Sequence, residues 1–234
     1  MHRRILSLVL CAFALMACGG GDVTTPPPLT VFAASSLRDV LSEIASEWTR
    51  QGGVTPQLRF EASSTLARQL RDGATADVFV SAAPEWVDVV QPLARHDWLS
   101  NTLVLVVRAD APDVALDSLA SLAVAGEQVP AGAYARAALQ HRGVALPTRT
   151  INGANVRAVL AIVSQGGAQA GIVYATDAAI DSTVRISQTF PATSHPRIVY
   201  SSALLRENGR AFFDALQSPW AIAIARRHGF VVLP

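Results

Sequence analysis

The feature that most constrains the fold is a pattern that occurs twice in the first third of the chain. In each copy a short apolar strand runs into two serines, which open an amphipathic helix. The copies are strand 29–34 with Ser35 and Ser36, and strand 58–62 with Ser63 and Ser64. A strand that passes directly into a helix is typical of α/β folds. Serine favours a helix start, where its hydroxyl and the free backbone amides can face an anion.

Strands and helices continue to alternate along the rest of the chain, so we expect an α/β fold with mainly parallel sheets. The clearest helix is 37–48, whose apolar residues recur at helical spacing and which Gly52 and Gly53 follow. Further strands are expected at 77–81, 103–107, 122–125, 148–151 and 171–174, and further helices at 133–141, 156–164, 207–216 and 219–228.

Two breaks in this pattern suggest two lobes. Asp110-Ala111-Pro112 follows the apolar strand 103–107, and segment 196–201 is expected to return the chain to the first lobe. The predicted first lobe is 29–106 plus 199–234, and the predicted second lobe is 107–198. Two crossings between α/β lobes form a hinge and a cleft, and a cleft beyond strand ends is a usual ligand site.

The N-terminal segment is predicted to be a signal peptide, residues 1–17. It has two arginines, then an apolar run too short to span a bilayer, then Leu15-Met16-Ala17-Cys18. The last four residues resemble a bacterial lipobox, which implies that Cys18 is lipidated, although a plain secretory signal is the alternative. Residues 18–28, rich in glycine and proline, are predicted to be the lipidated cysteine and a flexible tether. The protein is then expected to be periplasmic or exposed at the cell surface.

Composition and motifs exclude several functions. The formal charge of +1 becomes −1 when Arg3 and Arg4 leave with the signal peptide, so there is no basic footprint for nucleic acid. The only cysteines are Cys11 and Cys18, which leaves the mature domain without a thiol. The chain contains none of the common hydrolase, metalloprotease or phosphate-loop motifs. We therefore expect no enzyme activity and no cofactor, with a secreted α/β hydrolase as the alternative from another class.

The second predicted lobe has helix starts of a similar kind. Pro130 precedes the small residues Ala131 and Gly132, so a ligand can approach the backbone amides there. Asn155 is a plausible cap for a helix whose next residue, Val156, offers its amide. Tyr174 ends a strand, where its hydroxyl could face the cleft.

Six motifs, in this order along the chain, together resemble the periplasmic molybdate-binding proteins of molybdate ABC transporters. They are Val31-Phe32-Ala33-Ala34-Ser35-Ser36-Leu37, Ser63-Ser64-Thr65-Leu66-Ala67-Arg68-Gln69, Asp77-Val78-Phe79-Val80-Ser81-Ala82, Val129-Pro130-Ala131-Gly132, Asn155-Val156-Arg157 and Gly171-Ile172-Val173-Tyr174. The resemblance spans most of residues 29–232. It implies a two-lobed type II binding-protein fold and a monomer that delivers molybdate or tungstate to an ABC permease with its ATPase.

The resemblance also implies a ligand set for a tetrahedral dianion, held as an oxyanion without direct metal ligands. Matched position by position, the set is Ser36, Ser63, Ala131, Val156 and Tyr174. Ser35 and Ser64 remain alternatives within each serine pair.

Two charged residues lie near these positions in the sequence, and their relation to the proposed anion has to be stated. Glu61 is expected to point away from the anion or to be compensated, and Arg157 to be solvated or paired with neighbours. A fully deprotonated oxyanion only accepts hydrogen bonds, so a site lined with donors suits it. Sulfate or another tetrahedral oxyanion is the alternative ligand.

Overall fold

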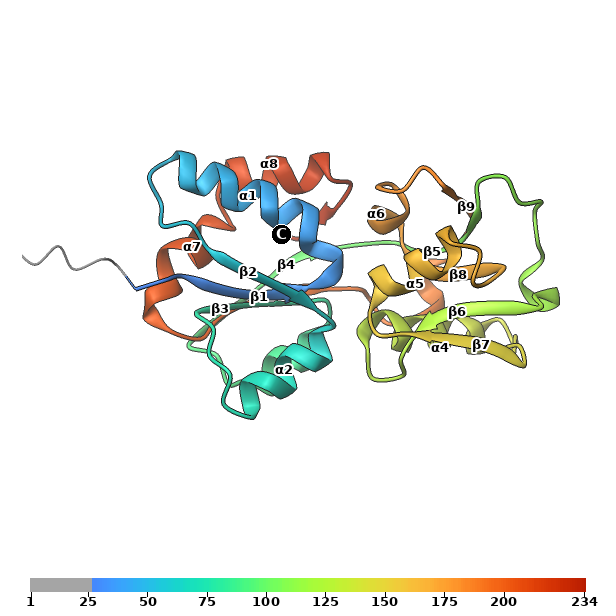
Figure 1. Cartoon of the computed structure of the whole chain (residues 1–234). Helices are drawn as coiled ribbons and strands as arrows, with labels where there is room; N and C mark the ends of the chain where they lie inside the picture. Colours follow the sequence, from blue (N-terminus) through green and yellow to red (C-terminus); the bar gives the residue numbers. More distant parts are fainter. Residues whose placement is uncertain (1–26) are drawn as a thin grey trace, which may run out of the picture.

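The structure, a computed structural model, describes residues 27–234 and consists of two α/β lobes side by side (Figure 1). The predicted signal peptide 1–17, the proposed lipidation site Cys18 and most of the tether 18–28 lie outside the described residues. None of the helices in residues 27–234 is long and apolar enough to span a bilayer.

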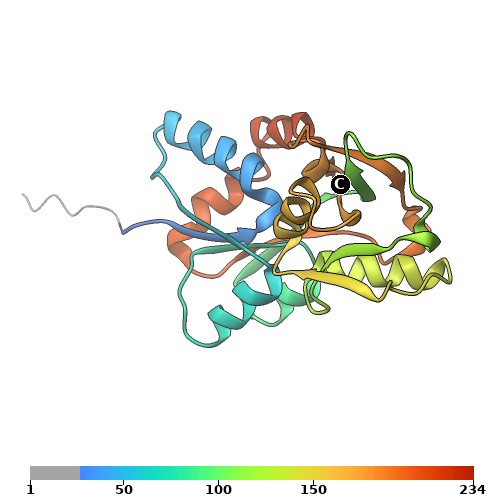
Figure 2. The ribbon, with the colours of Figure 1, turned by 45° about the vertical axis from the view of Figure 1, so that its right-hand side comes forward.

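The first lobe is built on a six-stranded sheet with the order β11-β4-β10-β3-β1-β2. Its strands are β1 (Thr30–Ala34), β2 (Gln57–Glu61), β3 (Val78–Ser81), β4 (Ala94–Ser100), β10 (Tyr200–Leu204) and β11 (Val231–Val232). Its helices are α1 (Arg38–Arg50), α2 (Ser63–Arg71), α3 (Pro84–Asp88), α7 (Arg210–Ala215) and α8 (Pro219–Arg227). Helices α1 and α8 pack together on one side of the sheet, and α2 lies on the other (Figures 1 and 2).

The second lobe is built on a five-stranded sheet with the order β7-β6-β8-β5-β9. Its strands are β5 (Leu103–Arg108), β6 (Ser121–Ala125), β7 (Arg149–Gly153), β8 (Ala170–Tyr174) and β9 (Val184–Thr189). Its helices are α4 (Pro130–His141), α5 (Val156–Ser164) and α6 (Ala175–Ala178).

The two-lobed α/β fold predicted from the sequence is confirmed, but both sheets are mixed. Strands β2, β1 and β3 run parallel, as do β7, β6 and β8. The strands that carry the chain between the lobes pair antiparallel with their neighbours. Each lobe therefore has a parallel half, whose strands feed the helices at the cleft, and an antiparallel half near the crossings.

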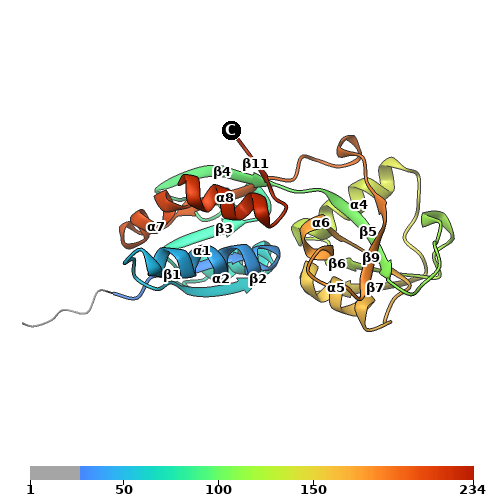
Figure 3. The ribbon, with the colours of Figure 1, turned by 90° about the horizontal axis from the view of Figure 1, so that it is seen from above.

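The first crossing lies earlier than predicted. Strand β5 was assigned to the first lobe, yet it pairs with β8 and β9 in the second sheet. The chain therefore crosses at Asn101 and Thr102, between β4 and β5, and not near residue 107. It returns between β9 and β10 through residues 190–199, which overlap the segment 196–201 expected for the second crossing. Figure 3 shows both connections between the lobes.

Local sequence explains where two helices near the cleft begin or end. Helix α1 buries Val40, Leu41 and Ile44 against the sheet, and its end is followed by Gly52 at φ +91°. That left-handed conformation is readily adopted only by glycine. Helix α5 is capped by Asn155, whose side-chain oxygen accepts a hydrogen bond from the amide of Ala158 at 3.1 Å. Each of these helices thus begins within four residues of the end of a strand.

Candidate functional site

A small cavity lies between the lobes, at the carboxyl ends of the parallel strands. Its volume is about 10 Å³, which is room for about one water molecule. Among the residues that line it are Ser35, Ser36, Glu61, Ser63 and Ala82 from the first lobe and Ala131, Val156 and Tyr174 from the second. All five residues of the predicted ligand set therefore meet at one cavity, together with Ser35.

Four helical segments begin at this cavity. The 3-10 helix η1 (Ser35–Leu37), which leads into α1, follows β1, and α2 follows β2. In the second lobe, α4 follows the loop after β6 and α5 follows the turn after β7. The first-turn amides of a helix lack partners within the helix, and its N-terminus carries partial positive charge. The cavity is thus lined from both sides by hydrogen-bond donors.

Close packing sets the position of the α4 start. A Cβ atom on Gly132 would lie 2.1 Å from the carbonyl oxygen of Gly126 and 2.4 Å from that of Ala125. Only glycine allows the helix to approach the end of β6 this closely. Since Pro130 has no amide hydrogen, the amide of Ala131 is the first that α4 can offer to the cavity.

Of the second serine pair, Ser63 lines the cavity. Its hydroxyl oxygen accepts a hydrogen bond from the backbone amide of Ala82 at 2.9 Å, which leaves its proton available for the cavity. Ser64 does not line the cavity. The Ser64 hydroxyl is buried and has no hydrogen-bond partner within residues 27–234.

Both serines of the first pair line the cavity, and both are buried. The hydroxyl of Ser36 lies 3.0 Å from the hydroxyl of Tyr200. Tyr200 is the first residue of β10 and was not among the sequence candidates. Only its position directly after the return crossing could have drawn attention to it.

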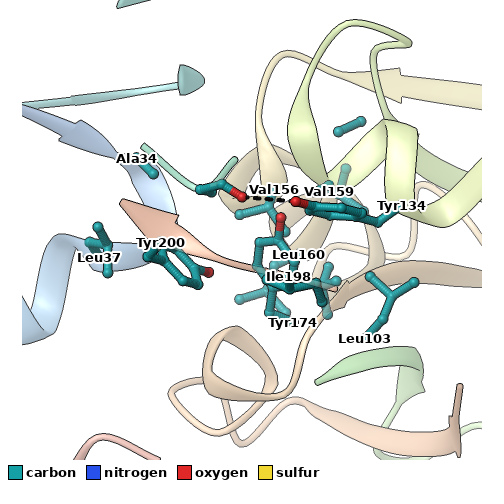
Figure 4. Close-up of a cluster of buried hydrophobic side chains, with 14 of the residues drawn as sticks. Ala34, Leu37, Leu103, Tyr134, Val156, Val159, Leu160, Tyr174, Ile198 and Tyr200 are labelled. Atoms are coloured by element: carbon teal, nitrogen blue, oxygen red, sulfur yellow. Dashed lines mark hydrogen bonds between the residues drawn. The ribbon is translucent and has the colours of Figure 1, made fainter. Parts of the chain in front are cut away.

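Tyr174, at the end of β8, contributes a phenol hydroxyl. The side chain is 1% exposed, and its oxygen has no hydrogen-bond partner among the described residues. Burial raises the pKa of Tyr174 well above its usual range, so the hydroxyl stays protonated and can donate. Figure 4 shows Tyr174 beside Tyr134 and Tyr200 where the lobes meet.

Arg157, the residue after Val156, joins the two lobes. Its guanidinium pairs with Asp177 in its own lobe and with Asp39 in the first lobe, and it also donates to the carbonyl oxygen of Ser36 at 3.4 Å. The expectation that Arg157 is paired with neighbours is confirmed. Burial raises the pKa of Asp177 to about 6, although the charge of Arg157 opposes that shift.

Other polar contacts also cross the cleft around the cavity. The Tyr134 hydroxyl donates to the carbonyl oxygen of Ala82 at 3.3 Å, the contact drawn in Figure 4, and Arg68 donates to Gln128 at 2.8 Å. Glu61 lines the cavity, and its carboxylate accepts a hydrogen bond from Asn155 at 3.4 Å. Glu61 is thus among the lining residues, and one of its carboxylate oxygens has a donor from the other lobe.

The two serines of the predicted ligand set have neutral partners. Among the described residues, the Ser36 hydroxyl bonds to a phenol and the Ser63 hydroxyl accepts from a backbone amide. Within residues 27–234 there is no group of three or more His, Cys, Asp or Glu side chains that could hold a metal ion. Hydroxyl and amide donors around a small buried space suit a compact ligand that accepts hydrogen bonds.

Two α/β lobes that enclose such a cavity define a two-lobed ligand-binding protein. The chain belongs to the family of bacterial extracellular solute-binding proteins, whose family model matches residues 29–231. This confirms the resemblance drawn from the six motifs.

Named relatives and a solved structure agree with this assignment. Molybdate-binding protein ModA of Escherichia coli (strain K12) is 35% identical, over 99% of this chain and 100% of the relative. The putative ABC transporter substrate-binding lipoprotein YvgL of Bacillus subtilis (strain 168) is 32% identical, over 97% of this chain and 96% of the relative. The periplasmic molybdate-binding protein of Azotobacter vinelandii shares the fold with a TM-score of 0.77, at 21% identity, over 88% of this chain and 99% of that one.

Proposed function

We propose that this protein captures molybdate or tungstate outside the cytoplasm and delivers it to an ABC permease driven by its ATPase. The observation that carries the proposal is the interlobe cavity, where hydroxyls and helix starts from both lobes converge. The E. coli relative named as a molybdate-binding protein is similar over its whole length, which supports this ligand class.

The proposed ligand set is the hydroxyls of Ser36, Ser63 and Tyr174 and the backbone amides of Ala131 and Val156. Ser36 and Ser63 belong to the first lobe and the other three to the second, so an anion would be held fully only when the lobes close. Hydrogen bonds to a charged group contribute about 1.5–3 kcal/mol each, which is enough to offset part of the cost of dehydrating the anion.

The donors favour a fully deprotonated anion over one that carries a proton. Molybdate, tungstate and sulfate only accept hydrogen bonds, whereas hydrogen phosphate also needs an acceptor. The Glu61 carboxylate, the acidic side chain at the cavity, is engaged by Asn155. Choice among the three dianions then depends on cavity size, and sulfate remains the alternative ligand.

Isothermal titration calorimetry with molybdate, tungstate, sulfate and phosphate tests the proposal. We expect stoichiometric, submicromolar binding of molybdate and tungstate, weaker binding of sulfate and none of phosphate. Submicromolar binding of phosphate without molybdate binding would contradict the proposed ligand class. Tight binding of sulfate alone would select the alternative ligand.

We further propose that Cys18 is lipidated and that residues 18–28 tether the protein, which acts as a monomer, to a membrane. The lipobox-like sequence before Cys18 supports this, and the related B. subtilis protein is named a lipoprotein. Expression of the full chain in a bacterial host, with fractionation and mass spectrometry, checks it. Wild-type protein should sediment with membranes and carry diacylglycerol on Cys18, and Cys18→Ser should be released or left unprocessed.

A further inference from the structure

A chain of hydrogen bonds connects the cavity to both crossings between the lobes. It starts at Asn101, which with Thr102 forms the first crossing, and reaches Tyr200, the residue at which the second crossing enters β10. Asn101 donates to the Tyr200 hydroxyl at 3.3 Å, and that hydroxyl lies 3.0 Å from the hydroxyl of Ser36. Three residues that are distant in sequence thus form one connected path.

The orientation of the Asn101 side chain is fixed by its neighbours. The backbone amide of Thr102 donates to its carbonyl oxygen Oδ1 at 2.9 Å. Its nitrogen Nδ2 must then be the atom that faces Tyr200 and the hydroxyl of Thr176, which it contacts at 2.8 Å. Because an amide NH₂ group only donates, the Tyr200 oxygen accepts at this contact.

The direction of the next bond follows. Tyr200 is fully buried, and burial raises its pKa above the usual range, so its hydroxyl keeps its single proton. Within residues 27–234, the hydrogen-bond partners of that hydroxyl are Asn101 and Ser36. Since Asn101 is a donor, the Tyr200 proton can be used only at Ser36, whose oxygen therefore accepts.

We propose that Asn101 and Tyr200 are positioning residues that commit the Ser36 hydroxyl to donate into the cavity. With its oxygen occupied by the Tyr200 proton, Ser36 directs its own proton at the ligand. Each bond in such a chain polarises the next, which strengthens the final donor. The inference rests on the proposed function, because it describes how Ser36 meets an oxyanion.

The same arrangement holds at the second serine, which supports the inference. The Ser63 oxygen accepts from the backbone amide of Ala82, so its proton too is free for the ligand. In both cases the protein supplies the hydrogen bond that the serine oxygen accepts. Neither hydroxyl then readily accepts a hydrogen bond from a protonated ligand. The hydrogen-bonded chain Asn101–Tyr200–Ser36, called the relay below, therefore adds to discrimination against protonated anions such as hydrogen phosphate.

The relay also makes Ser36 sensitive to lobe geometry. Thr176 belongs to α6 of the second lobe, and the amide of Ala175 donates to the carbonyl oxygen of Thr102 at 2.9 Å. Asn101 thus contacts the second lobe and Tyr200 at the same time. A change of angle at the crossing would alter the Asn101 contact with Tyr200 and, through it, the donor at Ser36.

A double-mutant cycle tests the relay. Tyr200→Phe removes only the hydroxyl and keeps the ring, which packs edge-on against Tyr174 and Phe230. We expect Tyr200→Phe to weaken anion binding about tenfold in the wild-type background, the order of one lost hydrogen bond to a charged ligand. In the Ser36→Ala background it should have little further effect, because the serine on which Tyr200 acts is gone.

Tyr134→Phe is the matched control, since it also removes a buried phenol hydroxyl at the lobe boundary. That hydroxyl donates to a backbone carbonyl and not to a serine, so its effect should be the same with and without Ser36→Ala. Asn101→Ala provides a second probe of the relay, with a loss that should be smaller in the Ser36→Ala background. Thermal unfolding without ligand verifies that each variant is folded.

The cycle uses whichever of molybdate, tungstate, sulfate or phosphate the wild-type protein binds most tightly. Equal losses from Tyr200→Phe in the two backgrounds would mean that the Tyr200 hydroxyl acts independently of Ser36, and would overturn the relay while leaving the proposed function intact. Unchanged anion affinity in Tyr200→Phe would also overturn the relay and leave the proposed function intact. If the wild-type protein binds none of the four anions, both the proposed function and the relay are wrong.

Discussion

Adjacent serines in one helical turn have different surroundings in this protein. Ser63 lines the cavity with an anchored oxygen, whereas the Ser64 hydroxyl is buried away from it. We predict that Ser63→Ala weakens molybdate binding about tenfold or more, since a hydrogen bond to a charged ligand is lost. Ser64→Ala, the matched control, should leave affinity unchanged. Calorimetry on both variants checks this, and a loss confined to Ser64→Ala would mean that Ser63 is the wrong serine.

The sequence could locate these serines but could not choose between them. Consecutive helical residues point about 100° apart, so the direction of each hydroxyl depends on where the helix begins. Helix α2 starts at Ser63, so both serines are helical residues, and the sequence pattern did not show which of them faces the cleft. Tyr200 was missed for a related reason: its contact with Ser36 joins residues 164 apart in the chain, and no local pattern reports such a pair.

At the scale of elements, helix position depends on a few close contacts. Gly132 lets α4 approach β6, and any Cβ there would collide with backbone atoms that cannot rotate away. We predict that Gly132→Ala lowers the free energy of unfolding by about 1–3 kcal/mol, the range for overpacking. It should also weaken anion binding, because the amide of Ala131 shifts with the helix.

Gly126→Ala is the control for this prediction. A Cβ at Gly126 would meet only the Val129 side chain, at an ordinary 3.7 Å. Denaturant unfolding and calorimetry should therefore show a near-native protein. Similar losses in the two variants would show that the loop before α4, and not the approach of the helix to β6, is the sensitive feature.

Most elements beside the cleft were predictable because each carries a strong local signal. Strands β1, β3, β6 and β8 are apolar and buried, and they pass into helices with recognisable starts. Strand β4 was missed because its seven residues, Ala94 to Ser100, are mostly polar and three of them are exposed. Because β4 was not predicted, the apolar strand β5 was assigned to the first lobe. An apolar run does not reveal which sheet it joins.

For the whole molecule, function depends on how strongly the lobes hold each other. Arg157 reaches across the cleft to Asp39 while Asp177 holds it from its own lobe. The Asp39 side chain is 41% exposed, so solvent screens the pair, and we assign it only about 1 kcal/mol. That contact exists only when the lobes are together, so it stabilises the closed form selectively.

We predict that Asp39→Asn speeds release of bound molybdate about fivefold, the factor that corresponds to about 1 kcal/mol. The association rate should change little, because the pair forms only after the lobes meet. Asp88→Asn is the control, since Asp88 pairs with Arg95 entirely within the first lobe. Stopped-flow measurement of ligand release distinguishes the variants. Release from Asp39→Asn at the wild-type rate would contradict the prediction, because the ligand and the remaining contacts would then hold the lobes together without this ion pair.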